Sequence, residues 1–431
     1  MKNKINIGVI GFGTIGSSVV KLLLEKRRLF RQRTGIDLNL MLVCDKDLRS
    51  KRDAKVPKSM LTRNALKVIQ HPDIDVVVEL IGGVHPAKEI VMKSLAAGKH
   101  VVTANKLLLA KEGSAIFKKA REVGMEIFFE ASVAGGVPVI KSIREGLVAN
   151  TFYSIMGILN GTSNYILSRM SSDGASFKVA LKEAQAKGFA EPNPLLDING
   201  MDSAHKIAIL SLLGFGKKVR MQDIYVEGIG GISPIDIQYA KDWGYTVKLL
   251  AIAKREGSEL GVRVHPTLLP SRYLLSSVSG AYNAIFIDAD LVGKQVYYGQ
   301  GAGKLPTGSA VLSDIMGMAE AIVYGKKSSR LIAAKRAEIK TLKKMDEVRT
   351  RYYVHFSALD KPGVLARIAE LLGRHNISIA SVVQKERRAA HIVPIVMLTH
   401  EAREKDMQAA LKKIDGLGVI KGKSVLLRLE G

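Results

Sequence analysis

The sequence contains few of the residues that mark secreted or membrane proteins. Its 431 residues include one cysteine, Cys44, one tryptophan and 6% aromatic residues. A single cysteine excludes a disulfide framework and favours a reducing compartment. The chain has no run of the roughly 18 apolar residues that a membrane span requires, and it begins with a strand-like segment in place of a signal peptide. We therefore expect a cytoplasmic protein without membrane contacts.

The scarcity of cysteine also excludes one class of chemistry. An acylating aldehyde dehydrogenase needs a thiolate nucleophile in its site. Cys44 stands inside the apolar run DLNLMLVCD (37–45), which we expect to pack as a strand near the N-terminus. The length and the 47% hydrophobic content are instead typical of an intracellular enzyme of two to three domains.

Acidic residues are scarce relative to basic ones. The chain has 40 Asp and Glu against 65 Lys and Arg, a net charge of +25. A basic surface binds phosphates without sequence preference, so nucleic acid is one candidate partner. The basic residues are scattered over segments such as KRRLFRQR (26–33) and KDLRSKR (46–52) and form no known nucleic-acid-reading motif. We interpret the charge as attraction for an anionic cofactor and acidic metabolites, and expect no nucleic-acid partner.

A glycine pattern near the N-terminus indicates the class of cofactor. A β-type run precedes Gly11, Gly13 and Gly16, and an amphipathic helical pattern follows them. The first glycine allows a tight turn, the second lets a pyrophosphate approach the backbone, and the third lets the helix pack on the strand. With a second strand at 37–45, this setting predicts a dinucleotide site rather than a chance glycine loop. The residues assigned to the site are Gly11, Phe12, Gly13, Thr14, Ile15 and Gly16.

The end of the second strand bears on the choice between NAD and NADP. An acidic residue there holds a ribose 2′-hydroxyl, and a nearby basic residue accepts a 2′-phosphate. Asp45 supplies the acid, and Lys46 opens a basic stretch that includes Arg49, Lys51 and Arg52. We favour NADP with NAD tolerated; the alternative is that these basic residues form a solvated loop.

The order of the patterns predicts an α/β protein of several parts. Strand and helix patterns alternate through 1–133, as in a Rossmann-type parallel sheet, and a helical segment at 303–328 returns to this domain. Residues 134–302 are predicted to form an α+β domain for substrate binding and dimerisation, and 329–349 a linker. Gly303, where the returning segment begins, is assigned to the cofactor site.

The last segment, 350–431, has strand and helix patterns in the order βαββαβ. That order predicts a small ferredoxin-like module. Nothing in the segment resembles a catalytic cluster, so we expect the module to bind an effector or to mediate association.

The stretch GFAEPNPLLDINGMDSAHK (188–206) concentrates charges beside an apolar helix. It holds Glu191, Asp197, Asp202 and Lys206, and the run IAILSLLGF follows directly. An ionised group taken out of water without a partner is costly, so these charges need partners or a ligand. Asp202 and Lys206 are four residues apart and share one helix face, where a simple salt bridge is the common explanation. The apolar continuation favours a core helix whose first turn faces a functional site.

Together these motifs resemble the homoserine dehydrogenase family with a C-terminal ACT module, over essentially the whole chain. The matching blocks, in the family's order, are GFGTIG (11–16), TANK (103–106), ASVAGGVP (131–138), NGTSNYIL (160–167), GFAEPNPLLDINGMDSAHK (188–206) and GQGAGKLPTGSAV (299–311). DKPGVLARIAELLGRHNISI (360–379) resembles the opening of an ACT module. The resemblance implies reversible, nicotinamide-dependent reduction of L-aspartate 4-semialdehyde to L-homoserine, a step toward threonine and methionine.

The resemblance also implies roles for individual residues. Lys206 matches the family's proton donor, and a lysine in a partly dry site can protonate the developing alkoxide. Asp202 would hold Lys206 and the substrate hydroxyl in line. Glu191 and Asp197 match acids that bind the substrate's ammonium group. Lys106 matches a second lysine near cofactor and substrate, although without the family it would be taken as a solvated lysine at a strand end.

The loop EASVAGGV (130–137) resembles the family's monovalent-cation loop. The resemblance implies that Glu130, Val133, Gly135 and Val137 correspond to its ligands, and backbone carbonyls suit a hard cation such as Na⁺. From the residues alone the segment would be a turn. The sequence has no His and Cys cluster for a transition metal.

Several alternatives remain for the ACT module and for the whole chain. Asp360, Gly363 and Asn376 lie where such modules bind amino acids between paired copies, and threonine is the expected inhibitor. The simpler alternative is a module that only dimerises; a homodimer or homotetramer is expected. For the whole chain, the alternatives are another oxidoreductase acting on a small amino or hydroxy acid, and a nucleotide-binding metabolite sensor without turnover.

Overall fold

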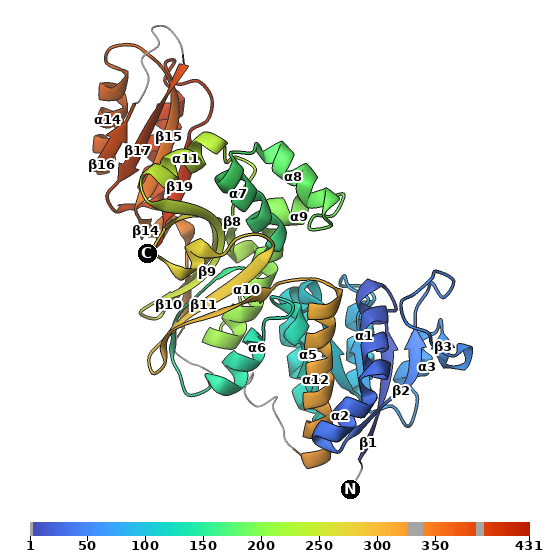
Figure 1. Ribbon diagram of the computed structural model, residues 1–431. Helices are drawn as coiled ribbons and strands as arrows, with labels where there is room; N and C mark the ends of the chain where they lie inside the picture. Colours follow the sequence, from blue (N-terminus) through green and yellow to red (C-terminus); the bar gives the residue numbers. More distant parts are fainter. Residues whose placement is uncertain (1–2, 326–338, 385–391) are drawn as a thin grey trace. The chain divides into compact units, whose positions relative to one another are not determined.

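The computed structural model describes residues 3–325, 339–384 and 392–431 (Figure 1). Contacts group these residues into two compact units. The first comprises residues 3–155, 205–221 and 283–325, and the second comprises residues 156–204, 222–282, 339–384 and 392–431. The predicted linker is described only from residue 339, and residues 326–328 of the predicted returning segment also lie outside the described part. The domain boundaries drawn from the sequence stay a prediction.

The first unit is built on a six-stranded parallel sheet. Its strands are β1 (Lys4–Ile10), β2 (Asp37–Cys44), β3 (Leu61–Thr62), β4 (Val76–Glu79), β5 (His100–Thr103) and β6 (Ile127–Phe128). They stand in the order β3-β2-β1-β4-β5-β6, and every neighbouring pair is parallel. In this doubly wound order the strand sequence reverses between β1 and β4. The expected Rossmann-type sheet is therefore confirmed.

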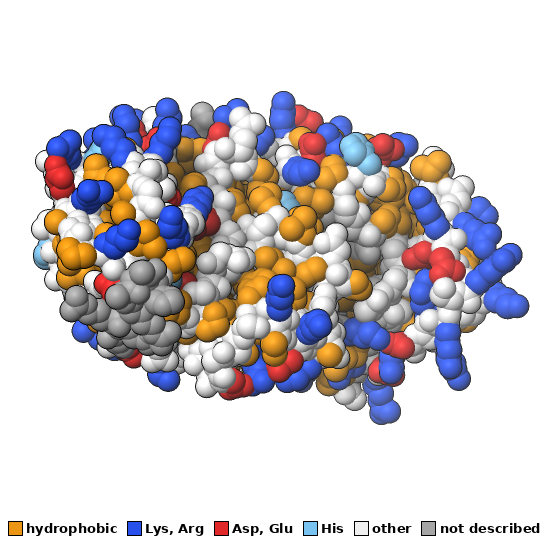
Figure 2. Space-filling view, turned by 90° about the horizontal axis from the view of Figure 1, so that it is seen from above, with side chains coloured by type: hydrophobic (Ala, Val, Ile, Leu, Met, Phe, Trp, Pro, Cys, Tyr) orange, Lys and Arg blue, Asp and Glu red, His pale blue; other side chains and the backbone are white. Residues whose placement is uncertain are grey.

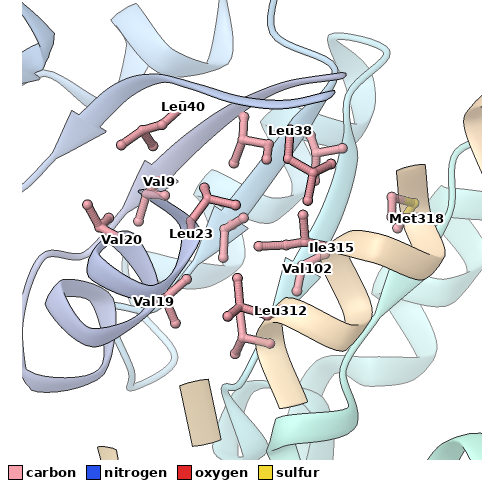
Figure 3. Packing of buried hydrophobic residues seen from close by; sticks show 14 of the residues in the cluster. Val9, Val19, Val20, Leu23, Leu38, Leu40, Val102, Leu312, Ile315 and Met318 are labelled. Atoms are coloured by element: carbon pink, nitrogen blue, oxygen red, sulfur yellow. The ribbon is translucent and has the colours of Figure 1, made fainter. Parts of the chain in front are cut away.

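One face of this sheet is covered by α1 (Thr14–Glu25) and α12 (Lys304–Tyr324). Figure 3 shows the apolar side chains of both helices meeting those of the strands. The labelled members of this cluster are Val9, Val19, Val20, Leu23, Leu38, Leu40, Val102, Leu312, Ile315 and Met318. Helix α12 thus supplies core residues to a sheet that begins about 300 residues earlier in the chain.

The opposite face of the sheet carries a second apolar cluster. It includes Val77 of β4, together with residues of α3 (Ala65–Ile69) and α4 (Ala87–Ala96). Val76 and Val78, the neighbours of Val77, belong to the first cluster. This alternation follows from the two-residue period of a strand, and burial on both faces explains the continuous apolar runs in the sequence.

Other helices and strands complete the first unit. They are α2 (Arg27–Thr34), α5 (Lys106–Val123), α6 (Val139–Lys141), β11 (Tyr282–Ala289), β12 (Gly293–Gln300), the 3₁₀ turns at Lys58–Met60 and Glu130–Ser132, and a π turn at Ser142–Gly146. Strand β7 (Phe152–Ile158) and helix α10 (Met201–Phe215) each contribute residues to both units, and Tyr282, the first residue of β11, belongs to the second unit.

The second unit contains the long antiparallel hairpin β9 (Tyr245–Glu256) and β10 (Glu259–Pro270). Two short strands, β8 (Tyr225–Val226) and β13 (Thr341–Lys343), pair with β10 in parallel. The helices of this part are α7 (Gly161–Asp173), α8 (Phe177–Ala186), α9 (Leu195–Ile198) and α11 (Pro234–Asp242). Strand β13 lies within the described part of the predicted linker.

The C-terminal module has the predicted βαββαβ order. Its elements are β15 (Tyr352–Leu359), α14 (Val364–Arg374), β16 (Ile379–Val383), β17 (Ile392–Thr399), α15 (Glu404–Asp415) and β19 (Val425–Leu429), with the short pair β14 (Arg349–Thr350) and β18 (Ala402–Arg403). The strands form an antiparallel sheet in the order β19-β15-β17-β16. Residues of both helices and of the strands share one buried cluster. The predicted ferredoxin-like module is confirmed.

The module shares a sheet with the rest of the second unit, which the sequence did not predict. Strand β19 pairs in parallel with β10, with Thr267 opposite Arg428 and Leu268 opposite Leu429. The Glu430 N–H also donates to the Leu268 carbonyl at 3.1 Å. Backbone hydrogen bonds therefore hold the module directly against β10 (Figure 1).

Basic side chains are distributed over the surface. On the face seen in Figure 2, Lys and Arg side chains project at many separate points, between apolar and acidic side chains. Helix α2 carries several of the exposed basic residues, and its Arg27 is paired with Asp37 at 2.6 Å. Among the described residues, no helix has both the length and the apolar character needed to cross a membrane.

Two close contacts between backbone segments define the turn between β1 and α1. Gly11 has a φ of 105°, and a Cβ there would lie 2.6 Å from the Leu80 carbonyl group. A Cβ on Gly16 would lie 1.9 Å from the Gly11 carbonyl oxygen, whereas one on Gly13 would meet nothing within 4 Å. The protein's own packing therefore requires glycine at positions 11 and 16 but leaves space beside Gly13.

Alanine at Gly16 and at Gly13 should therefore have different effects. Gly16→Ala forces α1 away from the turn and should lower the free energy of unfolding by about 2 kcal/mol or more. Gly13→Ala, at a φ of −70°, should change it by less than about 0.5 kcal/mol, yet weaken dinucleotide binding because the methyl group enters the space predicted for the pyrophosphate. Urea unfolding without nucleotide, followed by titration with NADPH, measures both effects. Equal stability of the two variants would contradict this account of the turn.

Candidate active site

Asp45, at the end of β2, braces the glycine turn of the first unit. Its carboxylate accepts the Phe12 N–H at 2.5 Å and the Asp47 N–H at 2.9 Å. These bonds tie the turn after β1 to the end of the neighbouring strand. Asp45 thus has a structural task at the position where the sequence predicts a contact with the cofactor ribose.

The loop after Asp45 keeps most of its basic side chains in solvent. Lys46, Arg49 and Lys51 are exposed, whereas Arg52 donates to the Asp47 carboxylate at 3.1 Å. Three exposed basic residues therefore follow the end of β2, where the predicted NADP preference requires a partner for a 2′-phosphate.

Gly303 and the start of α12 lie beside α1. The Lys304 carbonyl accepts the Ser18 hydroxyl of α1 at 3.2 Å, and the Lys304 ammonium pairs with Asp53 at 3.1 Å. Gly303 itself has a φ of 123°, which glycine adopts without strain. The returning segment thus reaches the helix that follows the glycine turn.

Lys106 stands at the carboxyl end of β5, as the first residue of α5. Asn105 caps this helix: its side-chain oxygen accepts the Leu108 N–H at 3.1 Å, and its side-chain nitrogen donates to the Gly83 carbonyl at 2.7 Å. Ligands of open α/β sheets bind at the carboxyl ends of the strands. Half-buried Lys106 is therefore on the same edge of the sheet as the glycine turn.

Asp197 and Asp202 of the second unit are brought together by Asn160. The Asn160 side-chain nitrogen donates to Asp197 at 2.7 Å and to Asp202 at 2.9 Å. Its oxygen accepts the Ser163 N–H at 2.8 Å and so caps α7, and the Ser163 hydroxyl donates to the Asp197 carbonyl at 2.7 Å. One amide group therefore joins two carboxylates that stand five residues apart in the sequence.

Asn160 is a site residue to which sequence reasoning gave no role. It stands in the block NGTSNYIL, and asparagine before a helical run is a helix-capping signal. That signal predicts the bond to Ser163 but not the bonds to two acids 37 and 42 residues later.

Glu191, the fourth charge of the predicted cluster, is exposed on the loop between α8 and α9. Its carbonyl accepts the Gln185 side chain at 3.3 Å. The hydrogen bonds of Asn160 therefore gather Asp197 and Asp202, whereas Glu191 stays in solvent at the edge of the same loop.

Helix α10 carries Asp202 and Lys206 on one face, four residues apart. Both are buried, with exposed fractions of 4% and 7%, and His205 between them is 6% exposed. Ile207 and Leu210 in the following turn are completely buried. The helix is thus the core helix that the apolar pattern predicts, and its first turns hold two buried charges.

The loop 130–137 packs against the loop that leads to α12. Ala134 and Gly135 both have positive φ values, 54° and 51°. A Cβ on Gly135 would lie 2.5 Å from the Gly301 carbonyl oxygen, and the Gly136 N–H donates to the Gln300 carbonyl at 3.1 Å. Two glycine-rich motifs that are far apart in the sequence therefore meet backbone to backbone.

Glu130 is a buried carboxylate at the start of this loop. Its two oxygens accept the Ile140 N–H at 2.8 Å and the Lys141 N–H at 2.7 Å, and its own N–H donates to Asp314 at 2.7 Å. Burial raises the pKa of Glu130 to about 7, against the opposing effect of the backbone donors. Burial, together with the charge of Glu130, also holds the pKa of Asp314 well above its usual value.

The arrangement around Glu130 fits a hard monovalent cation by its charge, since the carboxylate is deeply buried and the adjoining loop is rich in backbone carbonyls. Val133 and Val137 of this loop are almost completely buried, and because a valine side chain has no oxygen or nitrogen, only their carbonyls could serve as ligands. In the part of the chain that the structure describes, no group of three or more His, Cys, Asp or Glu residues could hold a metal ion.

The predicted effector residues lie at the two ends of α14. Asp360 and Gly363 belong to the turn before the helix, where Gly363 has a φ of 82°. Asn376 follows the helix with a φ of 56°. An 11-residue helix is about 16 Å long, so these residues do not form one pocket within a single chain.

Comparison with known protein families gives three matches along the chain. Residues 11–130 match the description homoserine dehydrogenase, NAD binding domain, and residues 138–316 match homoserine dehydrogenase. Residues 352–418 match the ACT domain. The first two matches together contain the glycine turn, the Asn160 cluster and helix α10.

Individual relatives match over almost the whole chain. A homoserine dehydrogenase of Neisseria gonorrhoeae is 41% identical over 430 residues, covering 99% of this chain and 98% of the relative. The crystal structure of a homoserine dehydrogenase from Thiobacillus denitrificans superposes with a TM-score of 0.91 at 42% identity and covers 99% and 98% of the two chains. A hyperthermophilic archaeal homoserine dehydrogenase in complex with NADPH has a TM-score of 0.62 at 26% identity, over 74% of this chain and 98% of its own. The chain therefore belongs to the homoserine dehydrogenase family, in a form that ends with an ACT domain.

Proposed function

We propose that the protein interconverts L-homoserine and L-aspartate 4-semialdehyde with NAD(P) as the hydride carrier. The observation that carries this proposal is the pair of homoserine dehydrogenase family matches, which span residues 11–130 and 138–316. The acids gathered by Asn160 support an amino-acid substrate, because neighbouring carboxylates attract an ammonium group.

The substrate's ammonium group is proposed to bind at Asp197, with Glu191 as the second acid. Asn160 fixes the side chain of Asp197, and Ser163 fixes its carbonyl. A site that is ordered before the ligand arrives loses less entropy on binding. These bonds therefore favour selection of a substrate with an amino group over a simple hydroxy acid.

Lys206 is proposed to transfer the proton of the reaction. It protonates the alkoxide oxygen when the aldehyde is reduced, and accepts the hydroxyl proton when homoserine is oxidised. The bound nicotinamide supplies or accepts the hydride. Asp202, one turn earlier on α10, is proposed to orient Lys206, and the burial of both side chains keeps bulk water from competing for the proton. Lys106 is proposed to contact cofactor and substrate at the edge of the sheet.

NADP is proposed as the preferred cofactor. The exposed Lys46, Arg49 and Lys51 can accept a 2′-phosphate, and Asp45 is already engaged by two backbone donors. The archaeal relative is described as bound to NADPH. The glycine turn and Gly303 are proposed to contact the pyrophosphate and ribose portions.

A monovalent cation such as Na⁺ is proposed to bind at Glu130 and at the carbonyls of Val133, Gly135 and Val137. The buried charge of Glu130 and the paired positive φ values in the loop support this assignment. The cation would neutralise Glu130 and stiffen the loop that contacts the start of α12.

The ACT module is proposed to respond to a small amino acid, with threonine as the first candidate. Asp360 and Gly363 lie at one end of α14 and Asn376 at the other, so a ligand that touches both sets requires two modules. This geometry supports a homodimer or homotetramer.

Replacing Lys206 tests the proposed chemistry. Lys206→Ala should lower kcat about 10²- to 10⁴-fold because the alkoxide loses its proton donor, while NADPH affinity stays unchanged. Absorbance of the reduced nicotinamide with L-homoserine and either NAD or NADP measures turnover and ranks the cofactors. Lys178→Ala, in the exposed first turn of α8, is the matched control and should behave as wild type.

Two outcomes of this assay would contradict the proposal. Near-normal turnover of Lys206→Ala would remove Lys206 from proton transfer. Absence of turnover in the wild-type protein, despite NADPH binding, would favour the metabolite sensor.

Asn160→Ser distinguishes the two roles of Asn160, which caps helix α7 with its oxygen and holds the two acids with its amide nitrogen. Serine still caps α7 but cannot donate to both carboxylates. We expect KM for L-homoserine to rise about tenfold or more, with a small change in NADPH affinity, because misplaced binding groups are costly. Asn193→Ser, an exposed asparagine on the loop before α9, is the control. Equal KM values for both variants would show that the Asn160 amide does not order the substrate site.

The pKa of Glu130 gives a test of the cation. Because burial raises this pKa from 4.5 to about 7, the folded state binds the proton more tightly than the unfolded state. The resulting stabilisation is complete below about pH 4.5 and is lost as the pH rises through about 7. A bound cation favours the ionised carboxylate, so NaCl should raise the free energy of unfolding more at pH 8 than at pH 5, relative to choline chloride.

Glu130→Gln is the variant for this test. It should remove the sodium effect and reduce the pH slope between pH 5 and 8, as measured by urea unfolding at constant ionic strength. The cation assignment fails if sodium stabilises wild type equally at both pH values.

A further inference from the structure

Arg428 of β19 lies at the centre of a buried polar cluster in the second unit. Its guanidinium donates to both oxygens of Glu404, at 2.9 and 2.5 Å, and to Glu227 at 2.7 Å. It also donates to the Tyr225 hydroxyl at 3.0 Å, and the Tyr225 ring lies 5.0 Å from the guanidinium carbon. Glu404 begins α15 of the C-terminal module, whereas Tyr225 and Glu227 belong to the segment that enters α11. Arg428 therefore joins the core of the module to that segment.

A second polar contact joins the module to α11. Asp236, in the first turn of α11, is completely buried. It accepts the Tyr353 hydroxyl at 2.9 Å and pairs with His355 Nδ1 at 2.8 Å, and both partners lie on β15. Asp236 also accepts the Ser233 N–H at 3.0 Å, which caps α11. The module thus contacts the segment 227–236, which we call the strap, at both of its ends. Strand β10 also holds the first end, where the Glu227 N–H donates to the Val264 carbonyl at 2.8 Å.

The middle of the strap contacts the loop that joins Asp197 and Asp202, the two acids of the proposed substrate site. The Ile229 N–H donates to the Ile198 carbonyl at 2.9 Å. A Cβ on Gly228 would lie 2.2 Å from the same carbonyl oxygen and 2.6 Å from Asn199 Cα. On the loop side, a Cβ on Gly200 would lie 3.3 Å from the Glu227 carbonyl oxygen. The backbone between Asp197 and Asp202 therefore rests directly on the strap.

We propose that the C-terminal module, acting through the strap, positions residues of the substrate site. Side chains of the module anchor the two ends of the strap, and the strap fixes the backbone that sets the spacing of Asp197 and Asp202. Glu227 and Asp236 are then positioning residues for the substrate's ammonium group, and Arg428 acts through Glu227. A displacement of β15 or β19 changes the affinity for the amino-acid substrate before it changes the affinity for the cofactor. This inference rests on the proposed role of Asp197 in substrate binding.

Glu227 is the residue to replace because its loss leaves the module intact. Arg428 would still make its two bonds to Glu404 and its bond to the Tyr225 hydroxyl. Glu227→Ala removes the Arg428 link to the strap, together with the bond that Glu227 accepts from the Tyr225 hydroxyl. Glu430→Ala is the matched control: Glu430 pairs with the buried Arg263 of β10, outside the strap. Both variants remove a carboxylate partner of a buried arginine, Arg428 of β19 in one and Arg263 of β10 in the other. Only Glu227→Ala removes a side-chain anchor of the strap.

Steady-state kinetics of the full-length chain give the first readout. Glu227→Ala should raise KM for L-homoserine about tenfold, while kcat and the Kd for NADPH stay within about threefold of wild type. Glu430→Ala should leave KM for L-homoserine unchanged. A loss that is purely structural would lower the active fraction and kcat of both variants without raising KM selectively.

Amide hydrogen exchange gives a readout that does not depend on turnover. In Glu227→Ala the segment 195–202 should exchange faster than in wild type, and in Glu430→Ala it should not. Unchanged exchange and unchanged KM in Glu227→Ala, or equal changes in both variants, would overturn the inference. If the wild-type protein binds NADPH but does not turn over homoserine, the proposed function fails, and the exchange result still decides whether the strap orders the loop.

Discussion

The second unit depends on holding Asp197 and Asp202 close together despite their mutual repulsion. The Asn160 amide donates to both, at 2.7 and 2.9 Å, but a neutral donor leaves the two negative charges in place. The pair is therefore ordered, which is what the proposed binding of an ammonium group requires. Such a site needs a backbone that does not relax, and this explains why the loop between the acids rests on Gly228 with no side chain in between.

Other buried charges in the chain are stabilised in different ways against the cost of leaving water. Arg428 is matched by Glu404 and Glu227, so its charge is compensated by the protein itself. Glu130 accepts two backbone N–H groups, and the charges of Arg144 and Lys141 also lower its pKa, yet burial still raises this pKa to about 7. Fully compensated charges support the fold, whereas charges left short of compensation are candidates for ligand or cation binding.

Local signals in the sequence predicted the fold well. The glycine turn is defined within six residues, and the order βαββαβ follows from strand and helix periodicity alone. Long-range contacts carry no such signal. Arg428 and Glu227 are 201 residues apart, and the pairing of β10 with β19 likewise joins distant segments, so neither has a local pattern. Closeness in sequence does not fix burial either: Glu191 is six residues from Asp197, and its side chain is exposed.

The strap gives the C-terminal module a physical route to the substrate site. A well-packed module does not deform gradually, so its strands shift together or keep their places. A shift of β19 carries Arg428 with it, and the charged contact to Glu227 is then either kept or broken. Asp236 anchors the other end of the strap to β15, so one movement of the module's sheet acts on both ends of the strap. Coupling of this kind needs two arrangements of a single short segment and no change in the fold of either partner.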